Sequence, residues 1–178
     1  MRVQLFLVVL SIFLSPVSLF ADDGAPVTLR NKTITVAWTV QRTVMTPRGE
    51  RQSPQFNQQR TIFVSSAGNV FVKSAVEGPG GTNEAELAPG DKTPKGGARE
   101  VHFAGGKLIA TAQRGKGAGR MMVSFDPSYS SCSVDLTFGR PAGERMTFRN
   151  RNGVLVELLG VTYSGQRCSI QDGNAFAH

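Results

Sequence analysis

The densest group of side chains that could do chemistry is a basic, glycine-rich stretch at residues 114–120. Arg114, Lys116 and Arg120 are interleaved there with three glycines, and Lys107 precedes them with no acidic residue between. Glycine lets backbone N–H groups approach an anion, and arginine makes forked contacts to phosphate, sulfate or carboxylate. The spacing is not that of a nucleotide phosphate-binding loop, and no helical pattern follows. The stretch predicts an anion-binding hairpin turn, or else a solvated turn whose charges protect a sheet edge.

Two carboxylates could support acid–base catalysis. Asp135 and Glu157 alternate with apolar neighbours in predicted strands, so they could face each other across a barrel mouth like the carboxylates of a glycosidase. Alternatively, both point to solvent. The chain has only two histidines and no G-x-S-x-G motif, so neither a metal site nor a serine nucleophile is indicated. A carboxylate-dependent hydrolase is therefore the second alternative function, and the sequence favours a protein that is not an enzyme and has no cofactor or metal.

Aromatic residues in predicted strands suggest a different function. Trp38 follows the same parity as apolar neighbours, which predicts a core position, but its N–H would need a polar partner. If Trp38, Phe63 or Phe71 lines a cavity, the protein is a β-barrel that binds a small apolar ligand. This is the first alternative function.

The charge of the chain favours an anionic partner. Twenty basic residues against thirteen acidic ones give a formal net charge of +7, which attracts anionic polymers and surfaces. Nucleic acid is not favoured, because binding it would require aromatic and basic side chains on one sheet face. Phe148 and Arg149 are adjacent, and so point to opposite faces.

The elements that would position these residues are short strands. Residues 33–41 alternate strictly between apolar and polar side chains, as in a strand with one buried face. No later segment has a helical pattern, and turn signals recur throughout the chain. The sequence predicts one all-β domain, a single antiparallel β-sandwich or small β-barrel of about eight to ten short strands. The other expected strands are residues 60–65, 69–74, 99–103, 107–113, 121–125, 133–138, 145–149, 154–159 and 161–170.

The remaining segments are predicted to be connections. Residues 44–59 are expected to be a long surface connection, with a short strand near residues 42–45. Residues 76–98, rich in glycine and proline, are expected to form a mobile loop. Residues 171–178 have no pattern and are expected to be an irregular tail.

The N-terminus and the cysteines indicate export. Residues 1–21 resemble a signal peptide, with Arg2 before a short apolar run and Ala21 at the expected cleavage site. The mature protein would be residues 22–178, with no membrane-spanning segment. Cys132 and Cys168 are the only cysteines, and an exported protein meets an oxidising compartment, so one structural disulfide is expected. The predicted location is periplasmic or secreted.

Four segments carry a resemblance to other proteins. They read T-I-T-V-A-W-T, I-F-V-S-S-A-G-N-V-F, S-S-C-S-V and G-Q-R-C-S-I. Together with the signal peptide, they resemble a group of small secreted or periplasmic bacterial β proteins with no assigned function. The resemblance implies export and a compact β domain, and it implies no activity, cofactor or site residue.

The leading hypothesis from sequence is an exported, non-enzymatic β domain that binds an anionic partner. The partner would be an envelope polysaccharide, a lipid head group or an acidic protein. The residues expected to bind it are Lys107, Arg114, Lys116 and Arg120.

Overall fold

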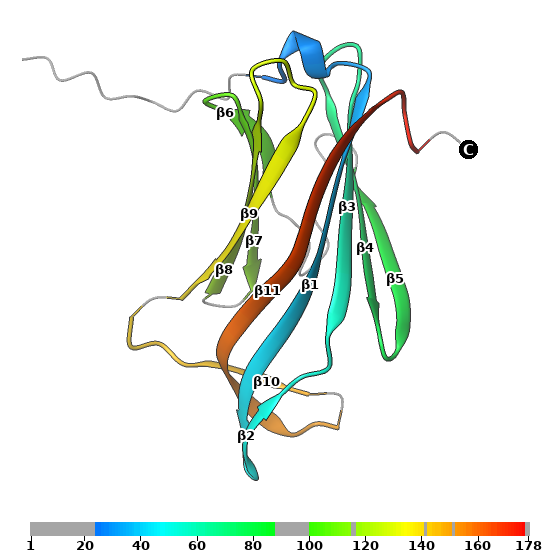
Figure 1. Cartoon of the computed structure of the whole chain (residues 1–178). Coiled ribbons are helices and arrows are strands. Elements are labelled where there is room, and N and C mark those ends of the chain that lie inside the picture. Colours follow the sequence, from blue (N-terminus) through cyan, green and yellow to red (C-terminus); the bar gives the residue numbers. More distant parts are fainter. Residues whose placement is uncertain (1–23, 88–99, 115–116, 141, 151, 177–178) are drawn as a thin grey trace, which may run out of the picture.

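The computed structural model describes residues 24–87, 100–114, 117–140, 142–150 and 152–176 (Figure 1). Within these ranges the chain forms eleven strands and one short 3₁₀ helix, η1 (Val27–Leu29), which confirms the all-β prediction. The strands are β1 (Lys32–Thr46), β2 (Gly49–Gln52), β3 (Phe56–Val64), β4 (Val70–Gly78), β5 (Gly81–Leu87), β6 (Glu100–Ala104), β7 (Lys107–Arg114), β8 (Gly117–Phe125), β9 (Cys132–Gly139), β10 (Met146–Arg149) and β11 (Leu155–Asp172).

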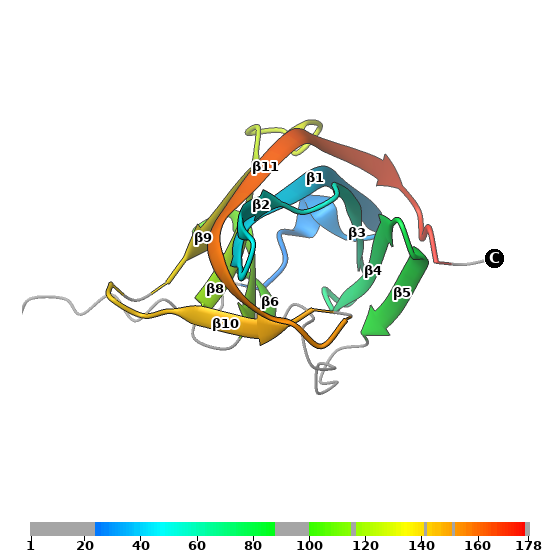
Figure 2. The same ribbon diagram turned by 90° about the horizontal axis from the view of Figure 1, so that it is seen from below.

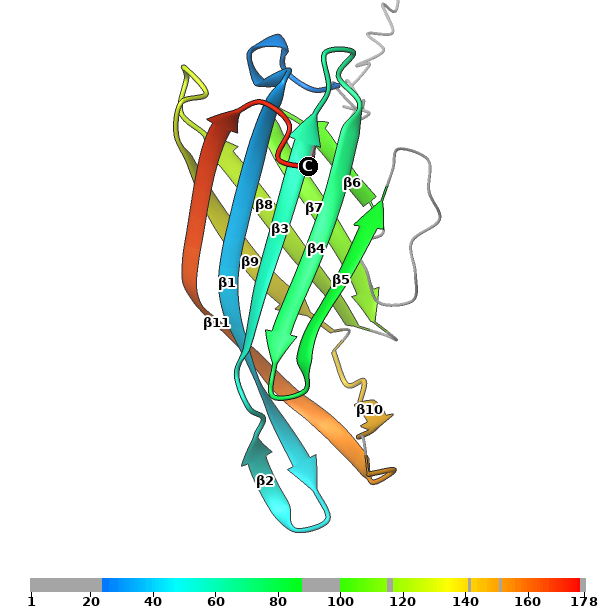
Figure 3. The ribbon, with the colours of Figure 1, turned by 90° about the vertical axis from the view of Figure 1, so that its right-hand side faces the viewer.

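The strands form two antiparallel sheets that curve around a common interior as a half-barrel (Figure 2). The first sheet has the order β10-β11-β1-β3-β4-β5, with β2 added to β1, and the second has the order β6-β7-β8-β9. Figure 3 shows the second sheet behind the first. The predicted disulfide between Cys132 and Cys168 is confirmed, and it joins the start of β9 to β11 across the two sheets.

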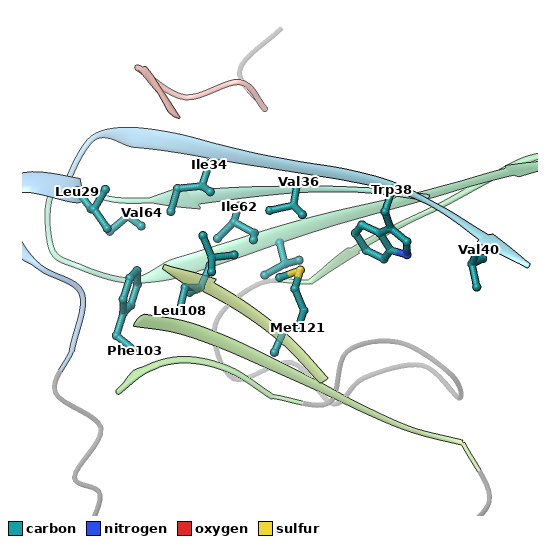
Figure 4. Packing of buried hydrophobic residues seen from close by; sticks show 13 residues of the cluster. Leu29, Ile34, Val36, Trp38, Val40, Ile62, Val64, Phe103, Leu108 and Met121 are labelled. Carbon is teal, nitrogen blue, oxygen red and sulfur yellow. The ribbon is translucent and has the colours of Figure 1, made fainter. Parts of the chain in front are cut away.

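The inner face of β1 supplies one side of the core, as its alternation predicted. Ile34 and Val36 are completely buried, and Trp38 and Val40 are nearly so. Their side chains all point from β1 toward the opposite sheet (Figure 4). Their partners at the packed end include Ile62, Val64, Phe103, Leu108 and Val123, all almost fully buried.

Three hairpins form where the sequence placed them. Gly68 has a φ of +87° in the turn between β3 and β4, a conformation that glycine adopts without strain. The β6–β7 hairpin turns at Gly105 and Gly106, and the β10–β11 hairpin closes through a hydrogen bond from the Asn150 N–H to the Val154 carbonyl.

Three expectations about connections need correction. Residues 76–87, expected to be part of a mobile loop, belong to the β4–β5 hairpin, and residues 88–99 lie outside the described ranges. Residues 44–59 contain the end of β1, all of β2 and the start of β3. The two strands expected at 154–159 and 161–170 are one strand, β11, because Gly160 between them has no positive φ and continues the pairing with β1. The predicted signal peptide also lies outside the described residues.

One end of the half-barrel is longer than the rest. The β1–β2 hairpin and the start of β11 with β10 extend beyond the other strands at the lower end of Figures 1 and 3. The pairing of β1 with β11 shifts register between Ala37 and Thr39 and again between Thr43 and Val44. Such bulges bend and twist strands, which agrees with the curvature of β1 and β11 toward this end.

The C-terminal segment is tied to the outer face of β1 through Thr33, which is completely buried. The Thr33 hydroxyl donates a hydrogen bond to the Gly173 carbonyl at 2.7 Å and accepts one from the Ala175 N–H at 3.1 Å. These bonds give the end of the chain a fixed position that its composition did not predict.

Replacing Thr33 with valine is expected to lower the free energy of unfolding by about 1–2 kcal/mol, because the two partly buried hydrogen bonds of its hydroxyl would be lost. Urea denaturation measures this change. Thr35→Val is the matched control, since Thr35 lies on the same face of β1 and its hydroxyl bonds to no described residue. Equal losses in the two variants would contradict a role for the tail contact.

Candidate functional site

A cavity of about 810 Å³ lies between the two sheets, beyond the packed end of the core. Small-molecule sites commonly have volumes of about 300–1,000 Å³. Much of its lining is apolar and comes from both sheets. These lining residues include Trp38 and Val40 of β1, Met121 of β8, Leu136 and Phe138 of β9, and Leu158 of β11.

The sequence of the second sheet explains why a hollow forms here. Leu108 and Val123 fill the space between the sheets at the packed end. On β7, Ala110 lies two positions beyond Leu108 on the same face. On β8, Gly119 lies four positions before Val123 on that face, with Met121 between them. Ala110 and Gly119 both line the cavity. Side chains this small leave the space opposite Trp38 unfilled.

The inner face of the first sheet changes from apolar to basic at the same level. Along β3, Val64 and Ile62 are buried in the core, and the next residue on that face is Arg60. Along β1, the series that ends with Trp38 and Val40 continues to Arg42. Both arginines line the cavity, and no aspartate or glutamate is among the described residues that line it.

Arg60 is a partly buried cation, and no carboxylate of the described residues pairs with it. Its guanidinium carbon lies 5.6 Å from the centre of the Trp38 ring, a distance at which a cation–π contact is favourable. Burial of the guanidinium lowers the pKa of Arg60 from its usual value to about 10, so it remains charged at neutral pH. Within the described part of the chain, no carboxylate forms an ion pair with it.

Two neutral hydrogen-bond donors accompany the inner arginines. The Trp38 ring is only 6% exposed, and its Nε1 atom has no hydrogen-bond partner among the described residues. Tyr163 of β11 pairs in register with Val40, and its pKa is raised by burial, an effect opposed by the charges of Arg42 and Arg60. Tyr163 is therefore a protonated phenol beside two guanidinium groups.

Three other arginines border the cavity at exposed positions. Arg120 of β8 is exposed, and so are Arg145 and Arg149. Arg145 is within 3.8 Å of Glu157, and the Nη1 of Arg149 donates to the Gly153 carbonyl at 2.7 Å. The rim arginines are thus hydrated and the last two have partners, unlike Arg60.

The predicted anion-binding residues are not brought together into one site among the residues described. Arg120 borders the cavity, whereas Lys107 is exposed at the opposite end of β7, next to the Gly105–Gly106 turn. The backbone of Arg114 pairs with Gly117, but the Arg114 side chain and all of Lys116 lie outside the described residues. Binding by this basic turn stays a prediction.

The other candidate residues divide between the inside and the outside. Trp38 lines the cavity, as the apolar-ligand hypothesis required, but Phe63 and Phe71 do not. Their rings pack against each other, with centroids 6.2 Å apart, and Phe176 covers Phe63. Asp135 is exposed on β9, and Glu157 contacts Arg145, so neither carboxylate lines the cavity. The described residues contain no group of three or more potential metal ligands.

The inner arginines could have been found from sequence by extending two alternations. Arg42 shares the parity of Trp38 and Val40, and Arg60 that of Ile62 and Val64. A basic residue on the buried face of a strand is a stronger sign of a site than a basic turn, because burying an unpaired charge is costly.

Comparison with known proteins does not identify this chain. No protein-family model matches it, and no curated protein is similar in sequence. Among the described residues, no helix is long and apolar enough to cross a membrane.

Proposed function

We propose that this protein is an exported binding protein, not an enzyme, and that its half-barrel holds an amphiphile with an anionic head group and an apolar chain. The observation that carries this proposal is the inward-facing pair Arg42 and Arg60 within a largely apolar cavity. An apolar ligand would leave Arg60 without a counter-charge among the described residues, and a small anion would leave the apolar walls uncovered. An amphiphile satisfies both.

The cavity favours a lipid-like molecule over the other anionic partners expected from the sequence. A polysaccharide or an acidic protein would be bound by an extended exposed surface. The desolvated Arg60 instead lies inside a concave site, where only a ligand that enters can reach it. The proposal therefore joins the anionic-partner hypothesis with the apolar-ligand hypothesis.

The location we propose is the periplasm or the extracellular medium. A disulfide persists in oxidising compartments, and the predicted signal peptide at residues 1–21 would direct the chain there.

Titration with three ligands tests this function, and Trp38, the only tryptophan, reports on the cavity. Dodecanoate is expected to bind saturably in calorimetry and to change Trp38 emission. Dodecanol, which lacks the charge, should bind about 30-fold more weakly or worse, a difference of about 2 kcal/mol. Propionate, which lacks the chain, should not bind measurably.

Each comparison can overturn one part of the proposal. Equal affinity for dodecanoate and dodecanol would remove the role of the arginines. Binding of propionate as strong as that of dodecanoate would remove the role of the apolar walls. Binding of none of the three would overturn the function as a whole.

A further inference from the structure

The cavity has a buried end and an exposed end. Trp38, Met121 and Ala110 line the end next to the core, and each is at most 6% exposed. Phe148 of β10 lines the other end and is 38% exposed. Along β1, Met45 lies seven residues beyond Trp38 and pairs with Glu157, which pairs in turn with Thr147 of β10, so about 23 Å of extended strand separates the two levels.

An anion would be bound most strongly by the hydrogen-bond donors at the buried end of the cavity. Among the described residues, the Trp38 N–H has no acceptor and Arg60 has no carboxylate partner, and Tyr163 is partly desolvated beside two cations. A desolvated charge is stabilised more strongly by a counter-ion than a hydrated one, because the local dielectric constant is lower.

The cations at the exposed end would bind an anion more weakly. Arg145 is 81% exposed and lies beside Glu157, and Arg149 is exposed and bonds to a backbone carbonyl. An anion placed between them would compete with water and with partners that are already present. The apolar side chains at this end, Met146 and Phe148, suit a hydrocarbon chain instead.

We infer that the ligand enters head first, so that a carboxylate or phosphate group is held by Arg42, Arg60, Tyr163 and the Trp38 N–H. Its apolar chain then leads outward toward Met146 and Phe148 of β10. This inference rests on the proposed function and adds the orientation and the residues that hold the head group. A small head group is expected, since two guanidinium groups, a phenol and an indole would contact it.

Bromine quenches tryptophan fluorescence only at short range, so brominated ligands report the orientation. Two dodecanoates are compared on the full mature protein, one with bromine on the carbon next to the carboxyl group and one with bromine on the terminal carbon. The head-first arrangement predicts several-fold stronger quenching of Trp38 by the first. Calorimetry with unmodified dodecanoate establishes separately that the ligand binds.

A second reporter provides the matched control. In the double variant Trp38→Phe, Phe148→Trp the single tryptophan lies at the exposed end, so the ligand brominated at the terminal carbon should quench more strongly. The opposite order in both proteins would show that the head group lies at the rim. Equal quenching by both ligands would show that no orientation is fixed, and either result would overturn the inference while the proposed function stands. Calorimetry that detects no binding would overturn both.

Discussion

Replacing Arg60 with methionine is expected to weaken dodecanoate binding by about 30-fold or more while making the empty protein more stable. The loss corresponds to about 2–3 kcal/mol, the usual contribution of a hydrogen bond to a charged group in a desolvated site. Dodecanol binding should change little, because it does not use the charge. Calorimetry of the two ligands with the wild type and the variant measures the effect, and the preference for the acid over the alcohol should nearly disappear.

The gain in stability follows from the unpaired charge. Burial lowers the pKa of Arg60 to about 10, below its value in the unfolded chain, so the unfolded chain binds this proton more tightly than the folded chain does. The charge therefore costs stability at every pH below about 10, and the cost is relieved as the pH rises above about 10 toward the higher pKa of the unfolded chain. Methionine removes the cost and loses a cation–π contact worth about 0.5–1 kcal/mol, so we expect a net gain of about 1 kcal/mol at neutral pH.

Arg167→Met is the matched control for this substitution. Arg167 lies on β11 opposite Ala37, is exposed, and does not line the cavity. Its replacement should leave both the acid–alcohol preference and the midpoint of urea unfolding nearly unchanged. If Arg60→Met destabilises the protein and leaves dodecanoate binding intact, Arg60 has a structural role and the assignment of the site is wrong.

The sequence was informative wherever structure depends on local alternation. The pattern at residues 33–41 placed Ile34, Val36 and Trp38 on the buried face, and glycine-containing turns placed the hairpins at Gly68 and Gly105. The same alternation carried enough information to place Arg60 on the inner face. Charge density favoured residues 114–120 instead, and of these Gly119 supplies a small inner position of β8 at the cavity.

The rest depends on pairings between residues far apart in the chain. β1 pairs with β11, so Lys32 lies opposite Asp172, and their side chains form an ion pair at 2.6 Å. No local pattern identifies this partner, because entropy and packing over the whole domain decide it. The cavity likewise arises from the coincidence of Ala110 and Gly119 on one sheet with Trp38 on the other. Each residue is unremarkable within its own strand.

Loss of the disulfide is expected to produce the largest change in stability. Cys132 and Cys168 are separated by 36 residues, and closing a loop of this length restricts the unfolded chain by about 4 kcal/mol. The double variant Cys132→Ala, Cys168→Ala should lose roughly that free energy of unfolding, measured by urea denaturation. Single variants are avoided, since each would leave a free thiol that can form bonds between molecules.

The disulfide should also affect ligand binding, because it links β9 of one sheet to β11 of the other, and both strands line the cavity. Leu136 and Phe138 contribute from β9, and Leu158 and Tyr163 from β11. Without the bond, binding must also hold the two sheets together, so dodecanoate should bind the double variant more weakly and, at equal ligand concentration, should stabilise it less against unfolding than it stabilises the wild type. Reductant added to the wild type should reproduce the double variant, and reductant added to the double variant should change nothing. If the oxidised and reduced wild-type proteins unfold at the same urea concentration, the two sheets are held together by their shared core alone.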